Sequence, residues 1–131
     1  MNPTSSARVR SPKTEQRPLR ALARAFEEAR RAVEEFGIRV LCVKAADRRG
    51  WRQDVENFVA IRDAVGDGVE IGVDPNTGWT VGDSLLAIHA MRQYDLGYIE
   101  QPIDRRDLRG LAEIRRQAQG IPVIAGQKDR A

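Results

Sequence analysis

The sequence has very little cysteine and no long apolar run. Cys42 is the only cysteine, which excludes an internal disulfide and a cysteine-based zinc site and is typical of a reducing compartment. No apolar run approaches the length of a membrane-spanning helix, and no signal-peptide core follows the N-terminus. These absences favour a cytoplasmic protein without a membrane partner.

The charged residues do not form a cluster of one sign. The formal net charge is +3 and the pI is about 9.5, but the arginines are mixed with glutamates and aspartates along the chain. Nucleic-acid binding depends on basic residues that gather on one face, so we expect no nucleic-acid partner. With 131 residues, of which 41% are hydrophobic and 31% charged, the chain has the composition of one ordinary folded domain.

Residues 1–18 lack the periodicity of a helix or a strand. They are rich in Ser, Thr, Pro, Arg and Lys, and Pro3, Pro12 and Pro18 interrupt them. This composition predicts a flexible N-terminal tail, followed by a folded domain over residues 19–131. An organellar transit peptide is the alternative interpretation, because such peptides are also rich in Arg and Ser and poor in acids.

The clearest local pattern lies in residues 69–74, where β-branched residues alternate with other types as they do in a strand. Asp74 ends this strand, and the turn-forming residues 75–78 follow it. Thr80 and Asp83 then have the spacing of a capping box, which predicts the start of a helix.

The same arrangement of a short apolar strand and a polar residue recurs along the chain. Strands are predicted over residues 37–44, 69–74, 97–100 and 121–125, with Lys44, Asp74, Glu100 and Gln127 at or just after their ends. Apolar residues at three- and four-residue steps predict helices between and before them, over residues 19–36, 51–65, 81–94 and 108–119. Strands that alternate with helices predict an α/β fold with parallel strands and right-handed crossovers.

Lys44, Asp74 and Glu100 form a candidate chemical site, because acids at strand ends are where (β/α) enzymes place metal ligands and bases. Removing a proton from the carbon next to a carboxylate requires a nearby base and a cation that stabilises the developing charge. Lys44 is a candidate for the base. Asp74 and Glu100, with a third oxygen donor, are candidates for holding Mg²⁺, which prefers carboxylate and water oxygens.

Each of these residues also has a purely structural interpretation. A lysine at a strand end is commonly a surface cation, Asp74 can cap a turn, and Glu100 can be solvated. Other reactive side chains have similar interpretations: Cys42 as a small buried hydrophobe, His89 as a packing or surface residue of a helix, and Trp79 as a packing residue or a rim residue that contacts a ligand.

Several ordered segments together resemble the catalytic barrel of the enolase superfamily, nearest to its mandelate racemase and muconate lactonizing enzyme branch. The resemblance extends from about residue 20 to residue 127 and implies the first half of a (β/α)8 TIM-type barrel, with about four parallel strands and flanking helices. It is carried by residues 37–44, 60–66, 73–80, 96–102, 108–115 and 121–127.

The resemblance implies a Mg²⁺-dependent abstraction of the proton alpha to a carboxylate, as in racemases, cycloisomerases and acid-sugar dehydratases. The substrate would be a small carboxylate or an acid sugar. Lys44 falls on the second lysine of the family's Lys-x-Lys strand, the usual base. Asp74 and Glu100 fall on the first two Mg²⁺ ligands, and the third falls on Gln127, whose neutral amide oxygen binds Mg²⁺ less strongly.

The chain also departs from the family pattern. Cys42 stands where the family has the first lysine of the pair, and no N-terminal capping domain or later barrel strands are found in these residues. A barrel of this type needs about 250 residues, so we expect an incomplete site with little activity alone. We expect the half-barrel to form a homo-oligomer or to bind a complementary half-barrel chain. The alternative function is a non-catalytic assembly module that binds a partner chain.

Overall fold

The computed structural model describes residues 6–9 and 18–126, and it contains a single parallel sheet with helices between its strands. Each strand pairs with the next one along the chain, so the order in the sheet is β1-β2-β3-β4-β5. The elements are β1 (Ser6–Val9), α1 (Pro18–Phe36), β2 (Val40–Lys44), α2 (Trp51–Val65), β3 (Glu70–Asp74), α3 (Val81–Arg92), β4 (Leu96–Glu100), α4 (Leu108–Ala118) and β5 (Val123–Ile124).

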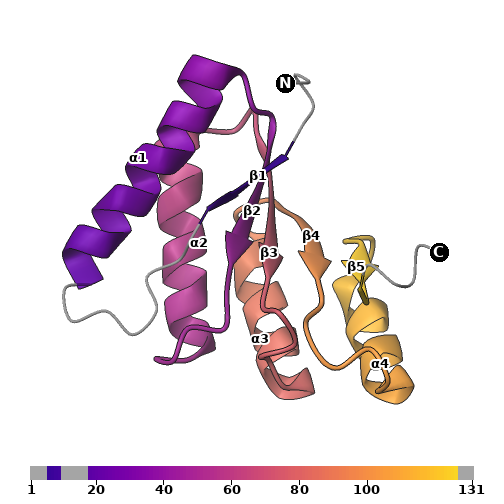
Figure 1. Ribbon diagram of the computed structural model, residues 1–131. Coiled ribbons are helices and arrows are strands. Elements are labelled where there is room, and N and C mark those ends of the chain that lie inside the picture. The colour runs from indigo at the N-terminus through magenta and orange to yellow at the C-terminus, as the bar shows by residue number, and fades with distance from the viewer. Residues whose placement is uncertain (1–5, 10–17, 127–131) are drawn as a thin grey trace.

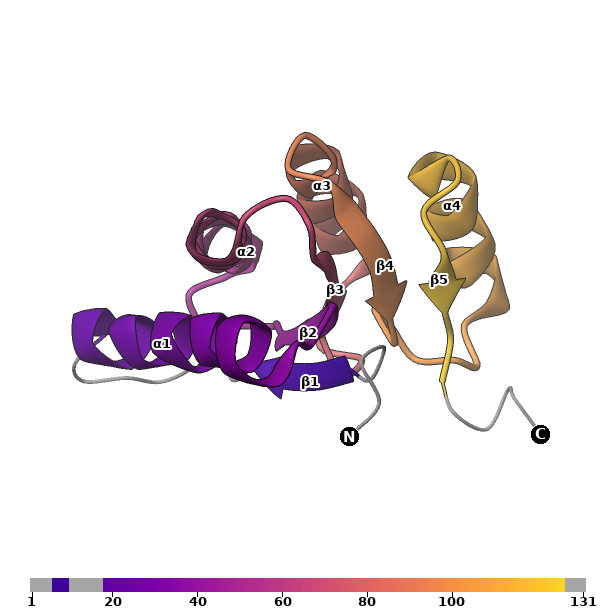
Figure 2. The same cartoon turned by 90° about the horizontal axis from the view of Figure 1, so that it is seen from above.

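The sheet is curved, and the helices lie on its outer face (Figures 1 and 2). Successive helices pack against each other, α1 on α2, α2 on α3, and α3 on α4. This arrangement follows from right-handed crossovers between parallel strands, which place each connecting helix on the same side of a curling sheet.

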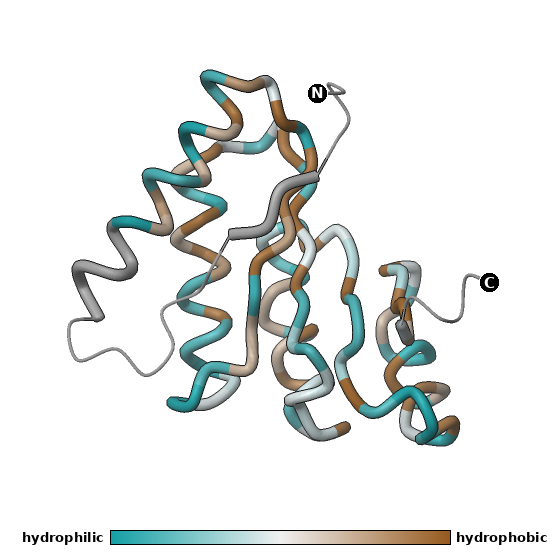
Figure 3. Tube along the Cα trace, viewed as in Figure 1, coloured by the Kyte–Doolittle hydropathy of each residue, from teal (hydrophilic) through white to brown (hydrophobic). Residues whose placement is uncertain are grey.

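The core lies between the sheet and these helices. On the strands it contains every second residue, such as Leu41 and Val43 on β2, while the intervening Cys42 and Lys44 point to the other face. The helices contribute apolar residues such as Phe58 and Ile61 of α2, and Figure 3 shows apolar and polar residues alternating along α2 and α4. Fully buried members include Leu41, Phe58, Ile61, Ile71, Ile88, Ile99, Leu111 and Ile114.

Side-chain caps are present at the starts of α3 and α4. Thr80 and Asp83 exchange side-chain to backbone hydrogen bonds at the start of α3, which is the predicted capping box. Asp107 accepts a hydrogen bond from the Gly110 amide at the start of α4. These side chains satisfy amides that have no partner within their own helix.

The prediction for residues 1–18 was wrong at Ser6–Val9, which form β1 and pair in parallel with Val40–Val43 of β2. The four predicted strands correspond to β2, β3, β4 and β5, so β1 is an additional strand in the sheet. A strand of four residues is too short to show an alternation that the sequence alone would reveal.

Among the helices of the described ranges, none combines the length and apolar character that crossing a bilayer requires.

Candidate metal and acid/base site

Lys44, Asp74 and Glu100 are the last residues of three neighbouring strands, β2, β3 and β4. Because the strands are parallel and adjacent, their C-terminal ends meet along one edge, which we call the carboxyl edge of the sheet. Lys44 and Asp74 are direct partners in the register of β2 and β3. The three side chains therefore start from one edge of the sheet, while the roles assigned to them remain predictions.

The Lys44 ammonium and the Asp74 carboxylate form an ion pair. Lys44 Nζ donates a hydrogen bond to Asp74 Oδ2 over 3.0 Å, and the Asn76 amide donates to Asp74 Oδ1 over 2.9 Å. The Asp74 side chain is 3% exposed, whereas the Lys44 side chain is 34% exposed. The carboxylate is thus fixed and buried, and the lysine can still meet a molecule that approaches from solvent.

Asp74 lies close to a second buried acid. One ligand atom from each of Cys42, Asp74 and Glu100 lies within 4.8 Å of the other two, and all three residues are buried. Two carboxylates at this separation repel each other strongly in a buried setting unless cations compensate them. Lys44 supplies one positive charge beside them, and a divalent cation between the two carboxylates would compensate them further.

The donor set fits Mg²⁺ in part. Carboxylate oxygens such as those of Asp74 and Glu100 are the hard ligands that Mg²⁺ prefers, whereas the sulfur of Cys42 is a soft ligand that Mg²⁺ does not favour. Gln127, the predicted third ligand, lies outside the described residues. Asp74 and Glu100 would hold the ion.

Cys42 was predicted as a small buried hydrophobe, and it is 2% exposed. Its proximity to the two acids was not predicted. The alternation of β2 carried a signal for it, because Cys42 and Lys44 are two residues apart and so share a face of the sheet. Below the acids, the Tyr98 ring covers Gly72, where an added Cβ would lie 2.3 Å from the ring.

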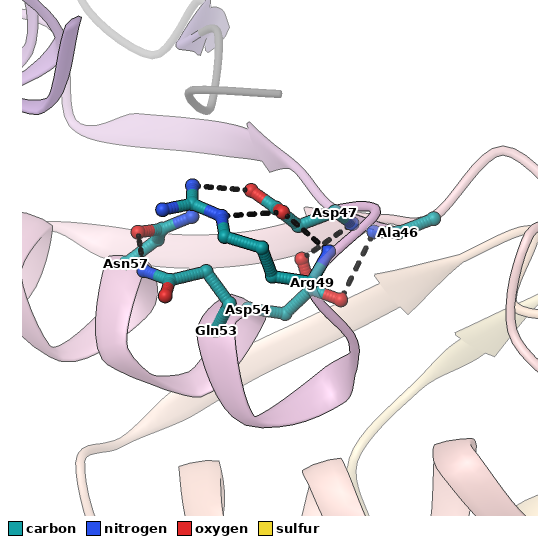
Figure 4. A network of polar contacts seen from close by, with 6 residues as sticks. All are labelled: Ala46, Asp47, Arg49, Gln53, Asp54 and Asn57. Atoms are coloured by element: carbon teal, nitrogen blue, oxygen red, sulfur yellow. Dashed lines mark hydrogen bonds and ion pairs between the residues drawn. The ribbon is translucent and has the colours of Figure 1, made fainter. Parts of the chain in front are cut away.

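Asp54 is a functional candidate that the sequence interpretation missed. Its buried carboxylate accepts hydrogen bonds from the amides of Ala46 (3.1 Å) and Asp47 (3.0 Å), in the loop after Lys44, as Figure 4 shows. It also accepts one from the Trp79 indole at 2.8 Å, in the loop after Asp74. Burial raises the pKa of the Asp54 carboxyl, and the Trp79 hydrogen bond partly offsets this.

A signal for Asp54 existed in the sequence. Asp54, Phe58 and Ile61 follow the three- and four-residue steps of the buried stripe of α2, so an acid stands on an apolar face.

Trp79 is 5% exposed and donates to Asp54, which confirms the packing interpretation for that residue. His89 is exposed on α3, away from the carboxyl edge.

The loops at the carboxyl edge contain an unusual backbone. Among the described residues, Ala46, Asn76, Thr77 and Gln101 have φ between 51° and 64°, and each follows shortly after Lys44, Asp74 or Glu100. Residues other than glycine seldom adopt this conformation, although asparagine does so more readily than most. Hydrogen bonds between the loops accompany it here, including one from the Thr77 amide to the Gln101 carbonyl over 2.7 Å.

Residues 24–130 match the family model of the Enolase C-terminal domain-like family, and the chain belongs to this family. It is 36% identical over 89 residues to a hydrophobic dipeptide epimerase of Enterococcus faecalis, a match that covers 68% of this chain and 25% of that protein. It is 34% identical over 105 residues to o-succinylbenzoate synthase of Thermobifida fusca, covering 79% and 32%. Further relatives include racemases, a cycloisomerase and a dehydratase.

The fold agrees with this membership. The crystal structure of the Enterococcus faecalis dipeptide epimerase complexed with Mg and the dipeptide L-Leu-L-Tyr superposes with a TM-score of 0.71 at 29% identity, covering 87% of this chain and 29% of that one. The fold is therefore part of a (β/α)8 TIM-type barrel, as predicted. The chain spans about a quarter to a third of the length of these curated relatives.

Proposed function

We propose that this chain supplies part of a Mg²⁺-dependent site that removes the proton alpha to the carboxylate of a small acid. Asp74 and Glu100 hold the ion, with Gln127 as the third oxygen donor that the family resemblance implies. When bound, Mg²⁺ stabilises the negative charge that develops on the substrate carboxylate. The observation that carries this proposal is the convergence of two buried carboxylates, within 4.8 Å, beside the partly exposed Lys44.

Lys44 is the candidate proton acceptor. Its ammonium is held by Asp74 at 3.0 Å, which fixes the direction in which the amine meets a substrate at the edge. In its neutral form the amine takes the alpha proton, and after the reaction it returns that proton to the substrate or to water. The hydrogen bonds of Asp54 to the neighbouring loops keep Ala46, two residues beyond this strand end, in place.

The substrate class comes from the relatives. Their names describe epimerases, racemases, a cycloisomerase and a dehydratase, and one solved structure holds a dipeptide. A dipeptide and an acid sugar share a carboxyl or carbonyl group next to a carbon that bears a proton. We propose a substrate of this kind, in a site that other strands of the barrel complete.

Calorimetric titration of Mg²⁺ into the chain tests the metal site. We expect binding that weakens about tenfold or more in Asp74→Asn and in Glu100→Gln, because each loses a charged oxygen ligand. The exposed helical acid variant Glu34→Gln is the matched control and leaves the affinity unchanged. An absence of Mg²⁺ binding, or equal affinity in all four proteins, contradicts the proposal.

A second candidate function is an assembly module. In the part of the sheet that is described, β1 and β5 are the outermost strands, and each pairs on one side only. An edge of this kind offers backbone amides and carbonyls to a further strand. We propose that a second copy or a complementary half-barrel chain binds there, which is compatible with catalysis by the assembled pair.

A further inference from the structure

We propose that Cys42 is a third metal ligand and that the site consequently favours a divalent cation that binds sulfur, such as Zn²⁺, over Mg²⁺. This inference rests on the proposed metal site and changes its metal preference. A single cysteine excludes a zinc site built on cysteines alone. A mixed site of one sulfur and two carboxylates is a different arrangement.

The geometry supports a shared ion. Cys42 Sγ and one oxygen each of Asp74 and Glu100 lie within 4.8 Å of one another, and the three residues come from three adjacent strands. Ligands of one tetrahedral zinc ion lie about 3.5 Å apart, since Zn–S is about 2.3 Å and Zn–O about 2.1 Å. Side-chain shifts of about 1 Å therefore suffice to bring all three onto one ion.

Solved relatives of this chain contain a divalent cation. A solved relative with the same fold is complexed with Mg, and another holds bound magnesium at a TM-score of 0.74 and 28% identity. The buried acids of this chain lie at the edge of the sheet where (β/α) barrels bind such ions. Cys42 is thus a sulfur next to a site where a divalent cation is expected.

A thiolate at Cys42 would add a third anionic ligand to the site. With the carboxylates of Asp74 and Glu100, it would give a divalent cation one sulfur and two oxygen ligands. The thiol proton leaves to the buffer when the metal binds. Sulfur ligands favour Zn²⁺ and related ions, and Mg²⁺ binds oxygen instead, so the thiolate shifts the preference of the site.

Titration of the intact chain with Co²⁺, a coloured probe for zinc sites, tests this inference. Cys42 is the only cysteine, so a near-ultraviolet charge-transfer band from thiolate to Co²⁺ can come only from this side chain. We expect the band in the wild-type chain, its displacement by Zn²⁺, and its persistence in a large excess of Mg²⁺. We expect no band in Cys42→Ser, and an affinity for Zn²⁺ that is lower by about tenfold or more.

The controls separate this inference from the proposed function. His89→Gln removes the only histidine and leaves Zn²⁺ binding and the sulfur band unchanged. If the wild-type chain binds metals through Asp74 and Glu100 without the sulfur band, the role of Cys42 is refuted and the metal site stands. If no divalent ion binds, both proposals fail. The wild-type spectrum decides the matter even where a variant folds poorly.

Discussion

Asp54 holds together the two loops that follow Lys44 and Asp74. Its Oδ2 accepts hydrogen bonds from the Ala46 amide and the Trp79 indole, and its Oδ1 accepts one from the Asp47 amide. Figure 4 shows the carboxylate directed at the Ala46–Asp47 backbone from the first turn of α2. A single buried side chain therefore couples the positions of two neighbouring loops at the carboxyl edge.

Replacing Asp54 by Asn should destabilise the chain by about 1–3 kcal/mol, because one buried amide then faces the NH₂ group instead of an oxygen. Urea unfolding monitored by circular dichroism measures the change. Asp63→Asn alters an exposed acid of the same helix and should stay within about 0.5 kcal/mol of the wild type. Equal stability of the two variants would refute this role of Asp54.

The pH dependence of this effect has a defined sign. Burial raises the pKa of Asp54 in the folded chain, so above the ordinary value, near 4, the folded chain keeps a proton that the unfolded chain has released. The contribution of Asp54 to the unfolding free energy therefore falls as the pH rises toward the raised pKa. The stability difference between wild type and Asp54→Asn should shrink over that interval. A difference that grows with pH contradicts the assignment.

At the scale of elements, Arg62 ties the end of α2 to the turns at the opposite edge of the sheet. This arginine is 6% exposed. Its guanidinium donates hydrogen bonds to the carbonyls of Gly66 at 2.8 Å, Val69 at 2.6 Å, Tyr94 at 3.2 Å and Asp95 at 3.0 Å. The planar, multiply donating guanidinium suits this task better than an ammonium.

Arg62→Lys should therefore destabilise the chain by about 2–4 kcal/mol, since several carbonyls, one of them in a fully buried hydrogen bond, lose a charged donor. Because Arg62 lies away from the carboxyl edge, we expect the Mg²⁺ affinity of the folded variant to equal that of the wild type. Thermal unfolding and calorimetry measure the two quantities. Arg109→Lys, at an exposed position of α4, serves as the control. A loss of metal affinity in folded Arg62→Lys would show that the two edges are not independent.

The sequence predicted helices more reliably than short strands, for a physical reason. The stripe of α2 repeats over several turns, and the prediction of residues 51–65 was confirmed. The end of α3 was predicted at about Tyr94 and lies at Arg92; beyond it the Tyr94 amide bonds to the Met91 carbonyl in a turn, and Arg62 binds the Tyr94 and Asp95 carbonyls from far away in the sequence. Long-range contacts of this kind leave no local pattern.

The candidate site was also predictable only in part. Local patterns predict the strand ends that hold Lys44, Asp74 and Glu100, and the adjacency of parallel strands brings these residues to one edge. The approach of Cys42 to the two acids depends on side-chain directions on three strands, which spacing alone does not give.

At the scale of the whole molecule, the described sheet is an open, curved layer with helices on one face only (Figure 2). The relatives are longer proteins, and this chain matches about a quarter to a third of their length. An open layer of this kind leaves strand edges for pairing and an inner face that further strands can cover.

We expect sedimentation velocity to show association that increases with protein concentration. Ile124→Lys places a charge on the edge strand β5, where it should weaken that association several-fold. Leu108 is 73% exposed on α4, so Leu108→Lys is a control with the same change in charge and should associate like the wild type. A monomer at all concentrations, together with no binding to a complementary half-barrel, would refute the assembly proposal.

The most direct test of the shared site is the location of a bound ion by NMR. Mn²⁺ binds oxygen ligands as Mg²⁺ does, and it broadens the signals of nearby amides. We expect broadening of the Ala45, Asn76 and Gln101 amides, next to the three strand ends, and its loss in Glu100→Gln. The amides of Gly37 and Gly68, before β2 and β3, should stay sharp. Broadening spread over exposed helical acids, or unchanged in Glu100→Gln, would contradict a metal site at the carboxyl edge.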